Sequence, residues 1–253
     1  MPQPIVPWMG GKRRLLPHLL KALPAHHTYV EAFAGGAALL FAKEPARAEV
    51  LNDINGDLIC LYRCVQHHLE EFVRQFRWSL VSRKMFEWLK LQDVSTLTDI
   101  QRGARFYYLL RSCFASKVTS PTFGVDARNP ARLNLLRIEE DLSEAHVRLS
   151  RVSIECLPWQ ELLRRYDRTE TLFFLDPPYW KLAGYGVAFG LEQYEELAST
   201  LASLKGKAIL TINDHAEMRR VFGRFRNETL KIKYTTQRHG ESEPRSERIY
   251  YSW

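Results

Sequence analysis

A short, mostly apolar run that stops at two prolines limits the fold of this chain more than any other feature. Residues Thr171–Leu175 read TLFFL, and Asp176-Pro177-Pro178-Tyr179 follows directly. A run of this length and composition is typical of a buried strand. Each proline fixes φ and lacks a backbone N–H, so the hydrogen-bond ladder of that strand cannot continue. We therefore expect a core strand that ends at Asp176, with the backbone carbonyls of the turn free to accept hydrogen bonds.

The four residues after this strand have the chemistry to hold a planar amine. An exocyclic amino group can donate to the Asp176 carboxylate and to the Pro177 carbonyl, while its ring stacks on Tyr179. Pro178 adds rigidity to the turn. The alternative is a strand end followed by a proline turn without any function, and the tetrapeptide alone leaves both interpretations open.

Strand and helix patterns alternate along most of the chain. Strand patterns occupy residues 28–33, 49–51, 152–156, 172–175, 208–212 and 249–251, and we expect the last of these to close the sheet. Helical spacing begins at Ala38, runs through residues 57–149 and returns at 191–204. This alternation predicts an α/β fold with a mostly parallel sheet and right-handed crossovers. Ligands of such folds bind at the carboxyl ends of the strands.

Two glycines follow the first predicted strand. Gly35 and Gly36 let the backbone approach a ligand closely, and Asp53, just after the second strand, can accept hydrogen bonds from ribose hydroxyls. This combination is typical of a nucleoside site, although the G-x-G-x-x-G of dinucleotide-binding proteins is absent.

A second glycine pair precedes Lys12 near the start of the chain. A phosphate-binding loop ending at Lys12 would need Gly in place of Val6 and Ser or Thr in place of Arg13. We therefore do not expect an ATP-driven function.

The charge of the chain favours an acidic partner. Its formal net charge is +7 and its pI is near 9.3. Seven basic residues and one acid lie between residues 102 and 137, which leaves +6 in that stretch. The basic residues are Arg102, Arg105, Arg111, Lys117, Arg128, Arg132 and Arg137, the acid is Asp126, and the aromatic residues among them are Phe106, Tyr107, Tyr108, Phe114 and Phe123. Such a mixture suits phosphate contact with base stacking or packing, and the alternative is a solvated helix face over ordinary core aromatics.

Cysteine spacing and hydropathy exclude several other classes. Cys60, Cys64, Cys113 and Cys156 lack the spacing of a zinc site, so we expect reduced core thiols and no metal. No apolar run approaches the length of a membrane span, and the first residues lack the long apolar segment of a signal peptide. We expect a cytoplasmic protein without a membrane partner.

Four motifs, in this order and spacing, resemble the Dam-like (class alpha) DNA adenine-N6 methyltransferases. They are PWMGGK at residues 7–12, YVEAFAGG at 29–36, NDINGDL at 52–58 and DPPY at 176–179. The resemblance covers essentially the whole chain and extends to PTFG at 121–124 and RSERI at 245–249. It implies a Rossmann-like, S-adenosylmethionine-dependent methyltransferase fold with an inserted, mainly helical target-recognition domain. The catalytic domain would then comprise residues 1–56 and 151–253, and the insertion residues 57–150.

The resemblance also implies roles for individual residues. Catalysis would rest on Asp176, Pro177, Pro178 and Tyr179, and S-adenosylmethionine would contact Trp8, Lys12, Phe33, Gly35, Asp53, Cys156, Leu157 and Asp176. Together with the basic stretch, it implies double-stranded DNA as the partner. We expect Lys117 to contact a phosphate, and Arg128 or Arg132, which flank an Asn-Pro turn, to lie at or near a base.

The expected function is site-specific methyl transfer to N6 of an adenine flipped out of duplex DNA, by a monomer. The chemistry needs no covalent enzyme intermediate, because positioning and electrostatics activate the amine. One alternative is an RNA or nucleobase amino-methyltransferase that uses the same cup. Another is a catalytically silent DNA-binding homologue, against which the intact Asp53 and Asp176 argue.

Overall fold

The computed structural model describes residues 3–8, 10, 12–114, 119–124, 133–182, 186, 188–233 and 244–253. The strands are β1 (Thr28–Glu31), β2 (Ala48–Asn52), β3 (Val152–Glu155), β4 (Thr171–Leu175), β5 (Lys207–Asn213), β6 (Arg226–Lys233) and β7 (Pro244–Tyr251). The α-helices are α1 (Leu16–Ala22), α2 (Ala38–Ala42), α3 (Gly56–His67), α4 (Leu69–Arg74), α5 (Arg83–Leu91), α6 (Asp99–Ser112), α7 (Ile138–Leu149), α8 (Trp159–Tyr166), α9 (Leu191–Ser203) and α10 (Ala216–Phe222). Short 3-10 segments are η1 (Lys12–Arg14), η2 (Val94–Thr96) and η4 (Leu135–Arg137).

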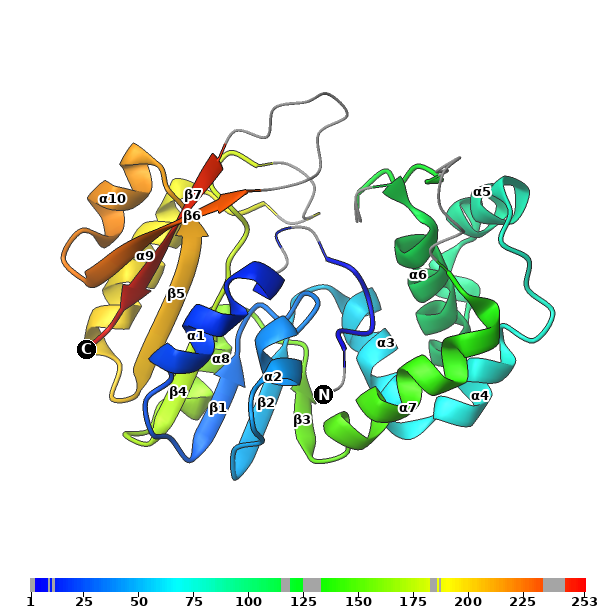
Figure 1. The fold of residues 1–253 in the computed structure, drawn as a ribbon, viewed down its shortest axis with the longest axis horizontal. Coiled ribbons are helices and arrows are strands. Elements are labelled where there is room, and N and C mark those ends of the chain that lie inside the picture. The colour runs from blue at the N-terminus through cyan, green and yellow to red at the C-terminus, as the bar shows by residue number, and fades with distance from the viewer. Residues whose placement is uncertain are drawn as a thin grey trace.

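The strands form one sheet in the order β3-β2-β1-β4-β5-β7-β6 (Figure 1). β1 to β5 pair in parallel, whereas β7 runs antiparallel to both β5 and β6. From β1 the chain proceeds to β2 and β3 on one side, and β4 and β5 lie on the other side. The strand order therefore reverses between β1 and β4, which is where a parallel sheet of this kind leaves a crevice at its carboxyl edge.

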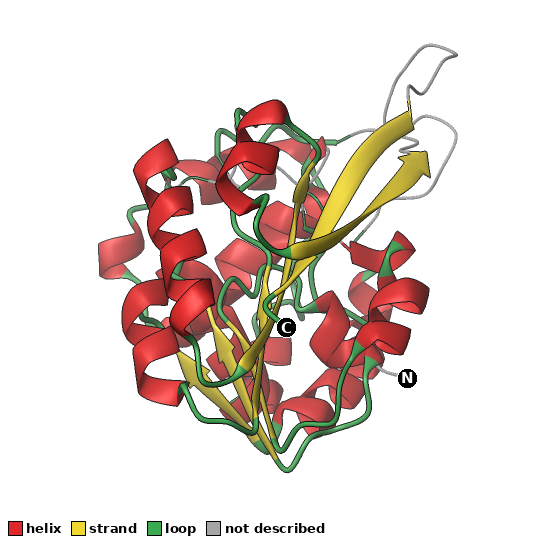
Figure 2. Cartoon of the chain, turned by 90° about the vertical axis from the view of Figure 1, so that its left-hand side faces the viewer, coloured by secondary structure: helices red, strands yellow, loops and turns green. Residues whose placement is uncertain are grey.

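The sheet is covered by helices on both faces (Figure 2). All five residues of β4 are buried: Leu172 and Phe174 pack in the cluster that contains residues of α1, α2 and α3, and Phe173 and Leu175 pack in the cluster of α8, α9 and α10. A strand that is buried on both faces needs apolar residues at successive positions instead of an alternation. This explains the apolar run from which the fold was predicted.

The predicted strands are confirmed. The ends of the first five differ by one or two residues, and the last strand begins five residues earlier than predicted. The expected closure of the sheet at residues 249–251 is wrong. These residues are the end of β7, which lies between β5 and β6, so β6 is the edge strand on that side of the sheet. β6 was not predicted. Its sequence, RNETLKIK, places Leu230 and Ile232 alternately with Lys231 and Lys233, which is the alternation typical of an antiparallel edge strand with one apolar face.

Helices α3 to α7 form the connection between β2 and β3 and lie beside β3 (Figure 1). This confirms the helical pattern at 57–149 for most of the described residues, but Cys113 and Phe123 form an isolated antiparallel bridge between α6 and η4. A single cluster of buried residues extends from Tyr29 and Leu51 in the sheet through Tyr62 on α3 to Phe72 and Tyr107. The insertion thus shares its core with the sheet, and the domain boundaries at 56 and 150 stay predictions.

Local sequence determines where two of these helices begin. The Asn55 side chain accepts hydrogen bonds from the N–H groups of Asp57 (3.0 Å) and Leu58 (3.2 Å) at the start of α3. At α6, Thr98 and Gln101 form a reciprocal capping box. Both arrangements satisfy N–H groups that have no partner inside the helix.

A buried charge cluster fixes α7 to the sheet. Glu49 of β2 accepts hydrogen bonds from Arg148 of α7 (Nη2 to Oε1, 2.9 Å) and from Lys43 (Nζ to Oε1, 2.6 Å). Arg148 also donates to the Leu40 carbonyl (2.8 Å). Burial alone would raise the pKa of Glu49, but the hydrogen bonds from Arg148 and Lys43 outweigh burial and lower it. The carboxylate therefore stabilises the folded chain in its ionised form.

We predict that Arg148→Met lowers the free energy of unfolding by about 3 kcal/mol at neutral pH, because one of the two cations that compensate buried Glu49 is lost. Urea unfolding measures the difference. A carboxylate with a depressed pKa stabilises the fold above its unfolded pKa and loses that contribution as the pH falls through the folded pKa. The difference between parent and variant should therefore shrink in acid.

The control is Arg165→Met on α8, where the Arg165 side chain is 50% exposed and pairs with Glu161. We expect a loss below about 1 kcal/mol there. Equal losses in the two variants would contradict the role given to the buried cluster.

Candidate functional site

A cavity of about 220 Å³ lies at the carboxyl ends of β1, β2 and β4, where the strand order reverses. Its walls are mostly apolar and aromatic, with two carboxylates among them. The lining residues are Trp8, Ala32, Phe33, Gly35, Asp53, Ile54, Asn55, Leu157, Pro158, Trp159, Gln160, Asp176, Pro177, Pro178, Phe189 and Gln193. Most of the site residues predicted from sequence thus meet in one cavity, whereas Lys12, Cys156 and Tyr179 are not among its lining residues.

The donors to Asp176 reach the same carboxylate oxygen. Lys12 Nζ lies 2.8 Å from Oδ1, and Thr211 Oγ1 of β5 donates to Oδ1 at 2.9 Å. No residue in the described part of the chain donates to Oδ2. Burial raises the pKa of Asp176, against the opposing effect of Lys12. The second oxygen of this carboxylate is therefore available to a ligand in the cavity.

The two proline carbonyls after Asp176 differ in their partners. The Pro178 carbonyl accepts a hydrogen bond from the Tyr194 hydroxyl of α9. Over the described ranges, no group donates to the Pro177 carbonyl. Asp176 and Pro177 thus supply two neighbouring acceptors at the cavity wall, as the sequence predicted for an amine cup.

Lys12 holds the turn at residues 176–179 together. Its ammonium group donates to the Gly10 carbonyl (2.8 Å) and the Tyr179 hydroxyl (2.7 Å), and it pairs with Asp176. These contacts use its three N–H donors. Lys12 is 4% exposed, and Glu247 Oε2 lies 4.0 Å from Nζ. The expected contact of Lys12 with S-adenosylmethionine stays a prediction, since its contacts in the structure are with the motif itself.

Gly35 is required by a neighbouring side chain. Its φ is +46°, and a Cβ atom at this position would lie 2.6 Å from the indole of Trp8. Its N–H donates to Asp53 Oδ2 (3.0 Å), and its carbonyl accepts from the Tyr62 hydroxyl (2.8 Å). The glycine loop is therefore held by the protein's own contacts, with Trp8 packed against it.

Asp53 is tied to the backbone on both sides. Besides the bond from Gly35, its Oδ1 accepts from the Asn55 N–H at 2.9 Å. Burial raises the pKa of Asp53, although these N–H donors oppose the shift. Each carboxylate oxygen has a further lone pair, so Asp53 can still accept from hydroxyl groups in the cavity.

Asn52 joins three segments that form the cavity wall. Its Nδ2 donates to the carbonyls of Ala32 (2.9 Å) and Leu157 (3.1 Å), and its Oδ1 accepts from the Leu157 N–H (2.8 Å). Asn52 is fully buried. This side chain therefore fixes Leu157, a predicted cofactor contact, to the ends of β1 and β2.

Glu31 at the end of β1 is a buried acid that sequence analysis did not single out. It accepts hydrogen bonds from the Tyr29 hydroxyl (2.8 Å) and from the Leu40 N–H of α2 (2.7 Å). Burial raises its pKa to about 7, against the effect of these donors. The acid links β1 to α2 next to the glycine loop.

One expectation about the cysteines is wrong. Cys60, Cys64 and Cys113 are buried, but Cys156 is exposed. Cys156 follows β3, which is an edge strand and has a neighbour on one side only. Its predicted place beside the cofactor remains a prediction.

The basic stretch from 102 to 137 contains arginines that are bound inside the insertion. Their partners are Asp57 for Arg102, the Leu89 carbonyl for Arg105, Asp141 for Arg111 and Glu140 for Arg137. Phe106, Tyr107 and Tyr108 are core residues. The three predicted DNA contacts, Lys117, Arg128 and Arg132, lie outside the described residues. The formal charge of +6 therefore exceeds the positive charge that the described arginines leave available to an acidic ligand.

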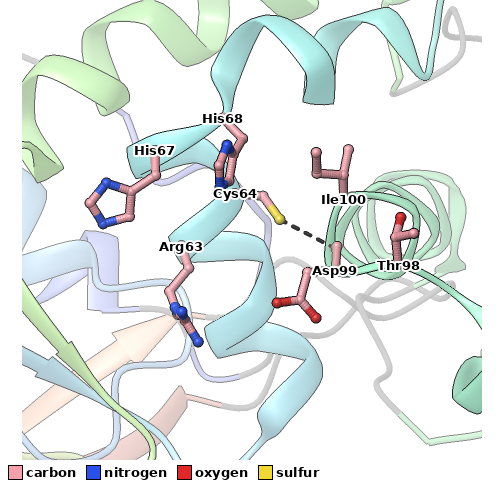
Figure 3. Close-up of a pocket in the computed structure, with 7 residues that line it drawn as sticks. All are labelled: Arg63, Cys64, His67, His68, Thr98, Asp99 and Ile100. Carbon is pink, nitrogen blue, oxygen red and sulfur yellow. Dashed lines mark hydrogen bonds between the residues drawn. The ribbon is translucent and has the colours of Figure 1, made fainter.

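A second cavity lies between α3 and α6 in the insertion (Figure 3). Arg63, Cys64, His67, His68, Thr98, Asp99 and Ile100 line it. The Cys64 thiol donates to the Asp99 carbonyl (3.3 Å). Within the described ranges, no group of three His, Cys, Asp or Glu side chains is arranged to hold a metal ion, and no helix is long and apolar enough to span a membrane. This cavity contains none of the predicted site residues.

Sequence reasoning missed several residues of the main site. Thr211 and Asn52 had a usable signal, because each is a polar residue that follows a run of apolar residues near the carboxyl end of its strand. No such signal exists for three further residues, because only packing brings them to the cavity. They are Trp159 of α8, Phe189 before α9 and Gln193 of α9.

A model of the D12 class N6 adenine-specific DNA methyltransferases matches residues 8–237, a range that includes every residue lining the main cavity. The type II methyltransferase M.CviBI of Paramecium bursaria Chlorella virus NC1A is 25% identical over 243 residues, which are 94% of this chain and 93% of that protein. The retron Ec67 DNA adenine methylase of Escherichia coli is 27% identical over 244 residues, 90% of this chain and 84% of that protein.

A further relative is the DNA adenine methylase of Escherichia coli K12, 24% identical over 266 residues, 92% of this chain and 88% of that protein. Among solved structures, SMU.472 complexed with SAH has a TM-score of 0.37 and 14% identity, and the match covers 93% of this chain but half of that one. That similarity is too low to inform the fold.

Proposed function

The chain belongs to the D12 class N6 adenine-specific DNA methyltransferases, and from this premise we infer that it transfers a methyl group from S-adenosylmethionine to adenine N6 at a specific site in double-stranded DNA. The main support is a pair of hydrogen-bond acceptors at the cavity wall. Asp176 Oδ2 and the Pro177 carbonyl have no donor among the described residues, at the edge where the cofactor-binding motifs converge.

The cavity fits S-adenosylmethionine in its chemistry. When bound, this cofactor supplies an electrophilic methyl group on a sulfonium. Asp53 would accept from the ribose hydroxyls, and Trp8, Phe33 and Leu157 would pack against the nucleoside, with Cys156 beside Leu157. The carboxylates of Asp53 and Asp176 complement a cationic ligand.

Asp176 and Pro177 would activate the target amine. The lone pair of N6 is delocalised into the adenine ring, so the free amine is a poor nucleophile. Two acceptors that each take one N–H favour a pyramidal nitrogen whose lone pair points away from them. Stacking of Tyr179 on the base stays a prediction from the sequence, because Tyr179 is buried, Lys12 Nζ lies over its ring at 4.6 Å, and Tyr179 does not line the cavity.

Adenine N6 lies inside the duplex, so the base must leave the stack. Flipping costs a few kcal/mol, which contacts to the extruded base in the site would have to offset. The predicted contacts of Lys117, Arg128 and Arg132 would bind and orient the duplex. A monomeric state and a cytoplasmic location are further predictions from the sequence.

Two alternatives differ in substrate or in activity. An RNA or nucleobase amino-methyltransferase could use the same amine cup, since the cup binds the amine and not the polymer. A silent DNA-binding homologue would bind DNA without methylating it. Transfer of radiolabelled methyl groups from S-adenosylmethionine to duplex DNA, RNA or free adenine separates all three.

We predict that Asp176→Ala lowers the single-turnover rate of DNA methylation at least about a hundredfold, because a preorganised acceptor is lost. The rate is measured with saturating cofactor and DNA. The control is Asp214→Ala, which removes a carboxylate that follows β5 and pairs with Arg219 and Arg248. A near-normal rate in Asp176→Ala, or an equal loss in the control, would refute the amine cup.

For the cofactor, Asp53→Ala should weaken S-adenosylmethionine binding by about 1 to 3 kcal/mol, the range for a hydrogen bond to a charged group. Titration calorimetry measures the affinity. Circular dichroism shows whether the variant is folded, since the bonds of Asp53 to Gly35 and Asn55 are also lost. Unchanged affinity in the folded variant would remove Asp53 from the cofactor site.

For DNA, Lys117→Ala should reduce the slope of log affinity against log salt by about 1 on all sequences. Replacement of a base-reading arginine, Arg128 or Arg132, should instead cost about 1 to 3 kcal/mol on the preferred site. Arg137→Ala is the control, because Arg137 pairs with Glu140. If the triple variant Lys117→Ala, Arg128→Ala, Arg132→Ala bound and methylated duplex DNA like the parent, the insertion would not be the recognition surface.

A further inference from the structure

Thr211 is a buried polar residue on β5, next to the strand that ends in the catalytic motif. Its exposed fraction is 0%, and its neighbours along the strand, Leu210 and Ile212, are also fully buried. Its hydroxyl donates to Asp176 Oδ1 at 2.9 Å and lies 3.5 Å from the Leu175 carbonyl. The shorter contact is the hydrogen bond that matters, because 3.5 Å is at the limit for a hydroxyl donor.

A hydroxyl at this position is not explained by packing. Valine has nearly the same shape, brings no polar group to be desolvated and suits a strand. Burying the hydroxyl therefore costs desolvation free energy, which only its hydrogen bond can offset. In this structure the bond goes to the one carboxylate that the proposed reaction uses.

The position of the bond on the carboxylate is also specific. Lys12 and Thr211 come from opposite ends of the sequence and both donate to Oδ1. Two donors from different elements on one oxygen fix the rotation of the Asp176 carboxyl group about χ2. The other oxygen, Oδ2, is then held in one direction without a protein donor from the described residues.

We propose that Thr211 is a positioning residue for methyl transfer: with Lys12 it occupies Asp176 Oδ1 and thereby orients Oδ2 to accept the N–H of the target amine. The inference rests on the proposed function, since it assigns a role within that same site. It goes beyond the motif because Thr211 lies outside all four stretches on which the resemblance stands.

Several charged or titratable groups face Asp176. Lys12 of η1 pairs with Asp176 and also donates to the hydroxyl of Tyr179, which follows β4. Glu247 of β7 and Glu31 of β1 interact with Asp176 electrostatically, without a hydrogen bond to it. The Thr211 hydroxyl lowers the pKa of Asp176, against the larger effect of burial. Loss of the hydroxyl should therefore raise that pKa, and the acid limb of the rate profile should move to higher pH, because the amine cup needs the ionised carboxylate.

The test compares Thr211→Val and Thr211→Ser with the parent enzyme. We expect Thr211→Val to lower kcat about tenfold, as for loss of a hydrogen bond to a charged group, with the KM for S-adenosylmethionine unchanged and the acid limb displaced to higher pH. Thr211→Ser keeps the hydroxyl and should restore most of kcat and the position of the limb. Thr211→Ala serves in the same assays if the valine variant does not fold.

Thr171→Val is the matched control. Thr171 is a buried threonine at the first position of β4, at the end of that strand away from Asp176. Its hydroxyl donates to the Tyr166 carbonyl at 2.8 Å. Its loss should lower Tm without changing kcat or the pH profile.

A parent enzyme that does not methylate DNA would refute the proposed function itself. With an active parent, the role of Thr211 is overturned if Thr211→Val keeps the parental kcat and pH profile. It is also overturned if Thr171→Val reproduces the effects of Thr211→Val, or if Thr211→Ser fails to restore them.

Discussion

The ammonium group of Lys12 lies at the point where the N-terminal segment meets the end of β4 and the turn at residues 176–179. Burying a cation is costly unless every donor finds an acceptor. Lys12 meets that condition through Gly10, Tyr179 and Asp176. The same contacts keep the partly buried Asp176 carboxylate in place at the cavity wall. Loss of Asp176 would leave the buried Lys12 ammonium without its counter-charge, so the arrangement of the site depends on this ion pair.

Around this pair, the walls of the cavity are held by hydrogen bonds between polar side chains and backbone groups. Asn52 connects Ala32 to Leu157, and Asp53 connects Gly35 to Asn55. These bonds replace ladder contacts at the point where the parallel strands end. These bonds fix the cavity walls before any ligand binds, and catalysis by positioning and electrostatics relies on such preorganisation.

The insertion is continuous with the site in two places. Helix α3 begins at Gly56, directly after its cap Asn55, whose N–H is bound by Asp53. At its other end, Arg148 of α7 is held by Glu49 of β2. The insertion also shares one apolar cluster with the sheet. The element proposed to bind DNA is thus attached to the strands that carry the proposed cofactor site.

Short stretches of sequence are enough to predict those features of this protein that depend only on neighbouring residues. The apolar run of β4 and its end at two prolines, the alternation of strands and helices, and the four motifs of the family are all properties of short stretches, because strand period and proline geometry are local. The tertiary structure decided the rest. Lys12 meets Tyr179 across 167 positions, and Thr211 meets Asp176 across 35. Trp8 occupies the space beside Gly35, β7 pairs between β5 and β6, and Cys156 is exposed at an edge strand. Each of these depends on which strands become neighbours in the sheet, and long-range packing fixes that order, not the local pattern.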